Sequence, residues 1–273
     1  MKRWMIALLL IAVAAAAGMF RSTSGRLSAS YTTTAGAAEG REEIRKSYQL
    51  SAGATVEVRG INGPVTIETA DTNTAEVYIL RTAQTQADLE NSRITITDSA
   101  TSLLIEGEQN AGGFWRHIWR NEVKQQVTLK VPRQIALTVK GVNGAVNTGE
   151  VTGAVQISGI NGKVLTAQTV GYSEISGVNG SVTIALRQLG EKGIRINGIN
   201  GAVELRFADK LNADLDVHGI NGRVKTDLPD VVVQGERDRS NYSARIGTGG
   251  APISMSGING SVRLTRDTSP ASE

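Results

Sequence analysis

One tetrapeptide, G-[IV]-N-G, occurs seven times in this chain, and it constrains the fold more than any other feature. Its asparagines are Asn62, Asn143, Asn161, Asn179, Asn200, Asn221 and Asn259. Their spacings are 81, 18, 18, 21, 21 and 38 residues, so the 38 corresponds to about two units and the 81 to about four. Periods of this length are typical of repeat architectures, in which each unit buries its apolar side against the next.

The residues that flank the tetrapeptide alternate between apolar and polar. A valine stands two residues after every Asn-Gly pair, and a second alternating segment, such as VEVR at 56–59, precedes the motif. Alternation with period two predicts strands that bury one face. Two short strands cannot bury that face alone, but stacked units can. We therefore expect an all-β fold, a β-solenoid in the form of a right-handed β-helix, with units of ~18–21 residues.

The Asn-Gly pairs are expected to form the tight turns of this solenoid. Both residues tolerate positive φ, and we expect this conformation at Gly162, for example. We also expect the seven motif asparagines to align along one edge and to form a hydrogen-bonded row.

The repeat is interrupted between Ala70 and Pro132. Four strand-like segments, 75–81, 94–97, 102–106 and 123–131, are separated here by polar stretches. We interpret the section over 70–132 as irregular coils that carry an insertion. It belongs to a single solenoid domain over 46–267, which a disordered tail over 268–273 follows.

The N-terminus predicts export. Residues 1–20 begin with two basic residues after Met1 and continue as an uncharged apolar stretch. Ala15 and Ala17 give the small-x-small pattern of a cleaved signal peptide, and an uncleaved anchor over residues 4–20 is the alternative. Both place the domain outside the cytoplasm, in the periplasm, at the cell surface or in the medium. Residues 21–45, rich in Ser, Thr, Ala and Gly, are expected to be a flexible spacer.

Composition argues against several classes of function. The chain has no cysteine and two histidines, and it contains no H-E-x-x-H, G-x-S-x-G, P-loop or EF-hand pattern, so we expect no catalytic site, metal or cofactor. His218 is expected to be a solvated surface histidine. Asp214 and Asp216 face outward together, which indicates a solvated strand face more than a weak calcium pair. The net charge of +3 includes two charges from the signal segment, so no nucleic-acid partner is expected.

The segment GGFWRHIWR, Gly112 to Arg120, is the one compositional anomaly, because it holds both Trp residues outside the signal segment. In a helical turn the two Trp side chains would share one side, with arginines at the flank. Such a segment suits a membrane interface, a sugar or a partner groove, and the alternative is a lid over an irregular coil or a solenoid end. The candidate binding residues are Phe114, Trp115, Arg116, Trp119 and Arg120.

The motifs resemble a known family. VEVRGINGPVTIET, then a variable stretch, then VTLKVPRQIALTVKGVNGAV and further G-[IV]-N-G units are similar to the bacterial putative-adhesin domain of unknown function, a relative of the head-GIN domain. The likeness covers about Tyr48 to Thr265. The resemblance implies an exported β-solenoid with an adhesin label and provides no catalytic residues.

Three hypotheses about function follow. The first is a non-enzymatic envelope or surface module, an adhesin or scaffold, whose rigid repeat surface binds a protein, a glycan, a membrane interface or a second copy of itself. The second is a carbohydrate-active β-helix enzyme with a site around Glu106, Glu108 and His117. The third is an envelope-stress sensor that partners a membrane protein.

Overall fold

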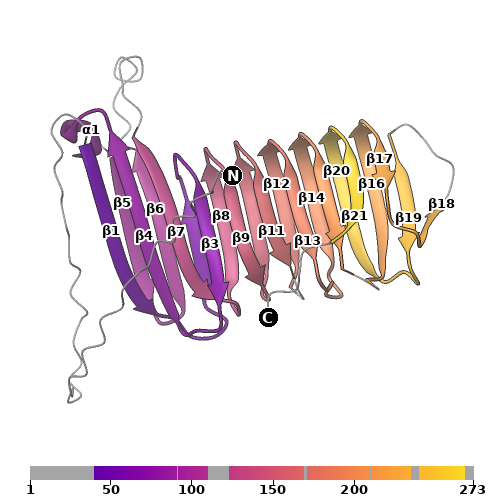
Figure 1. Cartoon of the computed structure of the whole chain (residues 1–273), viewed down its shortest axis with the longest axis horizontal. Helices are drawn as coiled ribbons and strands as arrows, with labels where there is room; N and C mark the ends of the chain where they lie inside the picture. Colours follow the sequence, from indigo (N-terminus) through magenta and orange to yellow (C-terminus); the bar gives the residue numbers. More distant parts are fainter. Residues whose placement is uncertain are drawn as a thin grey trace, which may run out of the picture.

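The computed structural model describes residues 40–90, 92–109, 123–168, 171–208, 211–234 and 240–267. Within these ranges the chain is all-β, with two large sheets and a single short helix, α1 (Gln86–Glu90). Neither sheet closes into a barrel. In both sheets the strands follow one another along the long axis of the molecule (Figure 1). No helix in the described part of the chain is long and apolar enough to cross a bilayer.

The first sheet, sheet A, has ten strands. In spatial order they are β1 (Gly40–Gln49), β4 (Thr74–Ala83), β7 (Lys124–Pro132), β3 (Val65–Ala70), β9 (Val146–Val151), β11 (Val164–Gln168), β13 (Val182–Leu186), β15 (Val203–Phe207), β21 (Val262–Arg266) and β17 (Val224–Thr226).

The second sheet, sheet B, has eleven strands. In spatial order they are β18 (Val231–Gln234), β19 (Tyr242–Ile246), β16 (Ala213–Asn221), β20 (Ala251–Asn259), β14 (Ile194–Asn200), β12 (Ser173–Asn179), β10 (Val155–Ile160), β8 (Ala136–Val142), β2 (Thr55–Arg59), β6 (Ser102–Gln109) and β5 (Ser92–Ser99).

Each tetrapeptide unit contributes one strand to each sheet. The strand before the motif of Asn161 is β10 in sheet B, and the strand after it is β11 in sheet A. Neighbouring units pair in parallel, so that Ile157 lies beside Ile175 and Val164 beside Val182. These four side chains have no exposed surface. Burial of such a side chain contributes about 1.5–3 kcal/mol, and the repetition of this row through the stack forms the core.

The two glycines of the motif at Gly159 to Gly162 have different roles at the turn. Gly159, the first glycine, has a φ of +64°, the left-handed region that disfavours residues with a Cβ. The expected left-handed φ at Gly162 is wrong. A side chain is excluded there for another reason, because a Cβ would overlap with the carbonyl oxygen of Gly144 in the neighbouring unit.

The last repeat does not lie at the end of the stack, which corrects the interpretation of the 38-residue spacing as two units. Strand β20 pairs in parallel with both β14 and β16, and β21 pairs with both β15 and β17. The unit of Asn259 therefore lies between those of Asn200 and Asn221. Between the units of Asn221 and Asn259, the chain forms the antiparallel hairpin β18–β19, which extends sheet B beyond β16. After this hairpin the chain turns back, and β20 and β21 insert between the units of Asn200 and Asn221.

The section over 70–132 does not fill the 81-residue gap with further units, as the spacing suggested. The units of Asn62 and Asn143 are direct neighbours, since β2 pairs with β8 and β3 with β9. The four strand-like segments of this section do form strands, β4 to β7, but these add to the end of the stack. There β6 and β7 pair in parallel with β2 and β3, while β4 and β5 are antiparallel to their partners.

Strand β1 is the edge strand of sheet A at this end. It begins at Gly40, so residues 40–45 belong to a strand and not to the expected spacer. Next to it, the buried guanidinium of Arg81 forms an ion pair with Glu42 and donates to the carbonyls of Leu89, at 2.6 Å, and Ser92. These bonds fix α1 and the start of β5 over the end of the core.

Residues 1–39 and 268–273 lie outside the described residues.

Candidate functional site

A first row of outward side chains crosses the outer face of sheet A near its β1 end. The strand register places Arg45 beside Tyr78, and Tyr78 beside Thr128. The alternation that buries Val77 and Ile79 turns Tyr78 to the opposite face of β4. The Arg45 guanidinium lies over the Tyr78 ring, 4.9 Å from its centroid. This cation–π contact is worth about 0.5–1 kcal/mol at an exposed position, and it holds the two side chains together.

A second row of outward side chains runs beside the first and is charged. Ser47 lies opposite Glu76, Glu76 opposite Lys130, and Lys130 beside Glu68. All four residues are exposed. Although Lys130 lies between two carboxylates, no ion pair forms at any of the three charged groups in the described part of the chain. Their hydrogen-bonding groups are therefore available to solvent or to a ligand.

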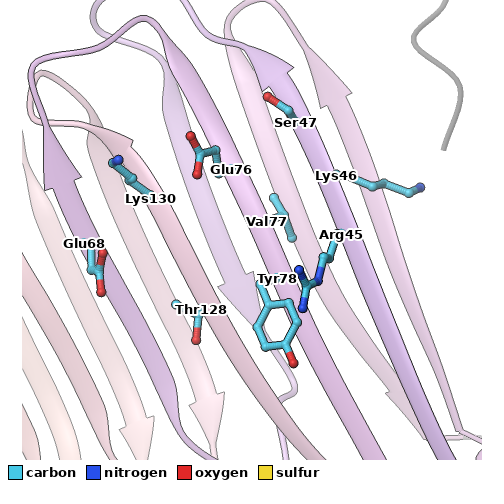
Figure 2. A pocket seen from close by; sticks show the side chains of 9 residues that line it. All are labelled: Arg45, Lys46, Ser47, Glu68, Glu76, Val77, Tyr78, Thr128 and Lys130. Atoms are coloured by element: carbon cyan, nitrogen blue, oxygen red, sulfur yellow. The ribbon is translucent and has the colours of Figure 1, made fainter. Parts of the chain in front are cut away.

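The two rows border one open depression of about 610 Å³ on this face (Figure 2). Its lining residues are Arg45, Lys46, Ser47, Glu68, Glu76, Val77, Tyr78, Thr128 and Lys130. In Figure 2 the Tyr78 ring and the Arg45 guanidinium lie close together, and Glu76 and Lys130 project from neighbouring strands. We refer to the outward residues Arg45, Ser47, Glu68, Glu76, Tyr78, Thr128 and Lys130 as the sheet A patch.

The sheet A patch combines an aromatic ring with hydroxyl, ammonium, guanidinium and carboxylate groups. A ring provides apolar contact area, and the charged and hydroxyl groups provide directional hydrogen bonds. Because the depression is open, the charged groups stay hydrated and a bound molecule would stay partly in water. This chemistry suits recognition of a polar, extended partner more than enclosure of a small molecule.

The seven motif asparagines form one continuous row of side-chain hydrogen bonds along an edge of the stack. Asn143 donates to Asn62 at 2.9 Å, Asn161 to Asn143 at 3.0 Å, Asn179 to Asn161 at 3.2 Å, Asn200 to Asn179 at 3.1 Å, Asn259 to Asn200 at 3.0 Å and Asn221 to Asn259 at 3.1 Å. At the first end, Asn62 donates to the carbonyl of Val123 at 3.0 Å. The amide groups are therefore engaged with one another, which indicates that they stabilise the turns.

His218 lies on the outer face of sheet B in a small hydrogen-bonded cluster. Its Nε2 lies 2.8 Å from Asp216 Oδ2, and its Nδ1 lies 3.3 Å from Asn241 Oδ1. The hydrogen bond with Asp216, reinforced by the one with Asn241, raises the pKa of His218. Ser243 Oγ donates to the other oxygen of Asp216 at 2.9 Å, so this serine is bonded to the carboxylate and not to the imidazole.

Asp214, two residues before Asp216, has partners of its own. It lies 3.4 Å from Arg245 Nε and accepts a hydrogen bond from the backbone N–H of Gly250 at 3.1 Å. Within the described ranges no group of three or more His, Asp or Glu residues is placed to hold a metal ion.

Two of the three residues of the enzyme hypothesis, Glu106 and Glu108, lie on β6. Glu106 forms a two-point ion pair with Arg59, with Nε–Oε1 and Nη2–Oε2 distances of 2.8 Å. Glu108 is exposed on the same strand, β6. His117 and the candidate binding residues Phe114, Trp115, Arg116, Trp119 and Arg120 lie outside the described residues.

The sheet A patch was not singled out by the sequence. The alternation in AEVYILR and in VTLKV does predict that Tyr78 and Lys130 point outward. The sequence carries no signal, however, for the pairing of β4 with β7 and β1, which brings Tyr78, Lys130 and Arg45 together.

No protein-family model matches the sequence, and no curated protein matches it significantly. Among solved structures, the chain is similar to a putative cell adhesion protein from Clostridium sporogenes, with 13% identity and a TM-score of 0.38, over 83% of this chain and 100% of that one. It is also similar to putative adhesins from Parabacteroides distasonis (14% identity, TM-score 0.31) and Bacteroides fragilis (11% identity, TM-score 0.29). Each of these two matches covers 82% of this chain and 97% of the other. These likenesses are too low to carry a functional conclusion.

Proposed function

We propose that this chain is an exported, non-enzymatic protein of the bacterial cell envelope or surface that acts as an adhesin. In this proposal it binds its partner at the sheet A patch. The observation that carries the proposal is the open depression of about 610 Å³, where the Tyr78 ring is accompanied by a row of charged groups that form no ion pair within the described ranges. That row consists of Glu68, Glu76 and Lys130. Export is supported by the signal-like residues 1–20.

We further propose that the fold is a β-solenoid of the head-GIN type. The parallel pairing of successive units, which is unshifted from β10 to β14 and from β11 to β15, and the continuous row of asparagine side chains support this. A solenoid would give the sheet A patch a rigid base, because the strands that carry the patch belong to a sheet of ten strands. A preorganised surface loses less conformational entropy when it binds.

The partner that best fits the sheet A patch is a polar glycan. Sugars present hydroxyl groups at their edges and C–H groups on their faces, and the patch offers hydrogen-bonding groups beside one aromatic ring. The patch contains both signs of charge, with Arg45 and Lys130 near Glu68 and Glu76. A long polyanion would favour a surface of one sign, so this mixture supports a neutral or zwitterionic polymer.

The test is binding of the purified protein to a glycan array and to isolated cell-wall polysaccharides. We expect Tyr78→Ala and Lys130→Ala each to weaken binding about tenfold, a loss of ~1.4 kcal/mol, with the melting temperature lowered by no more than about 4 °C. Gln156→Ala, an exposed change on the outer face of sheet B, is the control and should bind normally. Equal binding by all three variants would contradict this location for the site.

The same incubations test the absence of enzymatic activity. After incubation, each glycan is analysed for new reducing ends and for unsaturated products. A binding protein leaves the glycans intact. Clear turnover that depends on Glu106 or Glu108 would replace the proposal with the carbohydrate-active enzyme.

A further inference from the structure

Strand β18 forms the outer edge of sheet B at the end of the molecule opposite β1 (Figure 1). It pairs with β19 on one side, and no described strand pairs with its other side. Its sequence, VVVQ, is uncharged and rich in β-branched residues. Val232 is 62% exposed and is the one large apolar side chain that the described residues leave exposed. A free edge of this composition is a template for another strand.

The edge strand of sheet A at the other end of the stack, β1, is protected in the usual manner. Strand β1, GREEIRKSYQ, carries five charged residues in ten positions. Charged side chains on an edge strand oppose pairing with a further strand, because they would lose hydration there. The contrast with β1 indicates that β18 is an edge strand adapted to contact another strand.

The backbone geometry of β18 identifies which of its groups are free. The N–H of Gly247, which follows β19, donates to the carbonyl of Asp230 at 2.9 Å, so the backbone groups of Asp230 face β19. Backbone groups alternate sides along a strand, so those of Val232 and Gln234 also face β19. The N–H and C=O groups of Val231 and Val233 therefore point to the free edge.

We propose that the occupant of this edge is the β18 strand of a second copy of the chain, paired antiparallel about Val232. In this register Val231 of one copy faces Val233 of the other, so the free N–H and C=O groups of both residues bond to one another. Val232 faces Val232 as a pair without direct backbone bonds, in which the two side chains lie close.

This register is self-complementary in charge as well as in hydrogen bonding. It places Asp230 opposite Gln234, so no like charges meet. A register centred one residue earlier, on Val231, would place Pro229 opposite Val233, and proline has no N–H to donate. The Val232 register is thus the better fit.

The interior of the stack gives an independent reason for a second copy here. Val231 and Val233 lie beside the buried residues Ile246 and Ala244, yet both are only partly buried. A second β18 strand would cover this part of the core, since Val231 and Val233 of the second copy lie on the same face. Removal of their apolar area from water favours the dimer.

The proposal is distinct from the glycan site, because β18 and the sheet A patch lie at opposite ends of the molecule (Figure 1). A dimer through β18 would present two patches at its far ends. Two linked sites raise the apparent affinity for a repeating polymer without any new contact.

The test is sedimentation of the purified full chain over a wide range of concentration. We expect the wild type to form a dimer, and Val232→Lys to weaken it at least about tenfold, since two lysines would then face each other. The control is Thr97→Lys, an exposed change on β5, the edge strand of the same sheet at the other end, which should dimerise normally. At a concentration low enough for all three proteins to be monomeric, both variants should melt like the wild type.

A crosslink tests the register itself. The chain has no cysteine, so Val232→Cys introduces a single thiol. In the proposed pairing the two thiols lie within reach of a disulfide, and mild oxidation should convert the variant to a covalent dimer. Thr97→Cys should remain free of crosslinks under the same conditions. A wild type that is monomeric at every concentration, a Val232→Lys variant that dimerises normally, or a Val232→Cys variant that fails to crosslink would each overturn the proposal.

Discussion

Asn161→Asp is the most informative change in the asparagine row, because it replaces one hydrogen-bond donor by an acceptor with almost no change in size. In the wild type, Asn161 donates to Asn143 at 3.0 Å and accepts from Asn179 at 3.2 Å. The carboxylate keeps the bond from Asn179. It loses the bond to Asn143 and places a negative oxygen beside the Asn143 Oδ1 that formerly accepted.

The expected loss is about 1–2 kcal/mol at neutral pH. The lost bond accounts for about 0.5–1.5 kcal/mol, and the opposed oxygen atoms add to it. For a protein of this size, each kcal/mol lowers the melting temperature by about 2–4 °C. The loss should depend on pH, because the introduced carboxyl group, once protonated, can donate to Asn143 again. The pKa of this carboxyl is therefore raised in the folded state, and the stability returns as the pH falls through that pKa.

The assay is thermal unfolding of the wild type, Asn161→Asp and Asn161→Ala at neutral and acidic pH. Asn161→Ala is the matched control, since it loses both bonds at every pH. We expect the deficit of Asn161→Asp relative to the wild type to shrink at acidic pH and that of Asn161→Ala to stay constant. Wild-type stability of Asn161→Asp at neutral pH would refute the view that the row stabilises the turns.

Three further predictions concern the stack and its surface. Gly159→Asn should be tolerated better than Gly162→Asn, since asparagine adopts left-handed φ while any Cβ at 162 meets a neighbouring backbone; unfolding midpoints check this. Val182→Asp should cost more than ~3 kcal/mol and unfold adjoining units, because it places an unpaired carboxylate in the core; circular dichroism would show the loss, and a stable variant would contradict the stacking. The stabilising contribution of protonated His218 should be present at acidic pH and be lost as the pH rises through its raised pKa, and Asp216→Asn should lower that pKa in an NMR titration.

Much of the fold could be predicted from the sequence because the repeat encodes it locally. The alternation around each motif determines which side chains are buried, and the equal spacing from Asn143 to Asn179 predicts the parallel pairing of β8, β10 and β12. The strand-like segments of the irregular section also form strands. These features depend on neighbouring residues and on a constant period, which a single sequence displays.

The order of the units and the position of the sheet A patch could not be predicted in this way. Spacing counts residues but carries no information on the direction in which a chain returns, so the insertion of β20 between β14 and β16 has no signal in the 38-residue gap. The patch depends on the same kind of long-range pairing, since Glu76 and Lys130 meet only through β4 and β7. In both cases antiparallel strands reverse the chain at points that the repeat does not mark.

The most direct test of the proposed function is to map the glycan contact on the protein by amide NMR, with the best binder from the array as the ligand. The account predicts shift changes that concentrate on β1, β4, β7 and β3 around Tyr78 and Lys130, and that disappear in Tyr78→Ala. Shift changes confined to sheet B or to residues 110–122, with the sheet A patch unaffected, would contradict it.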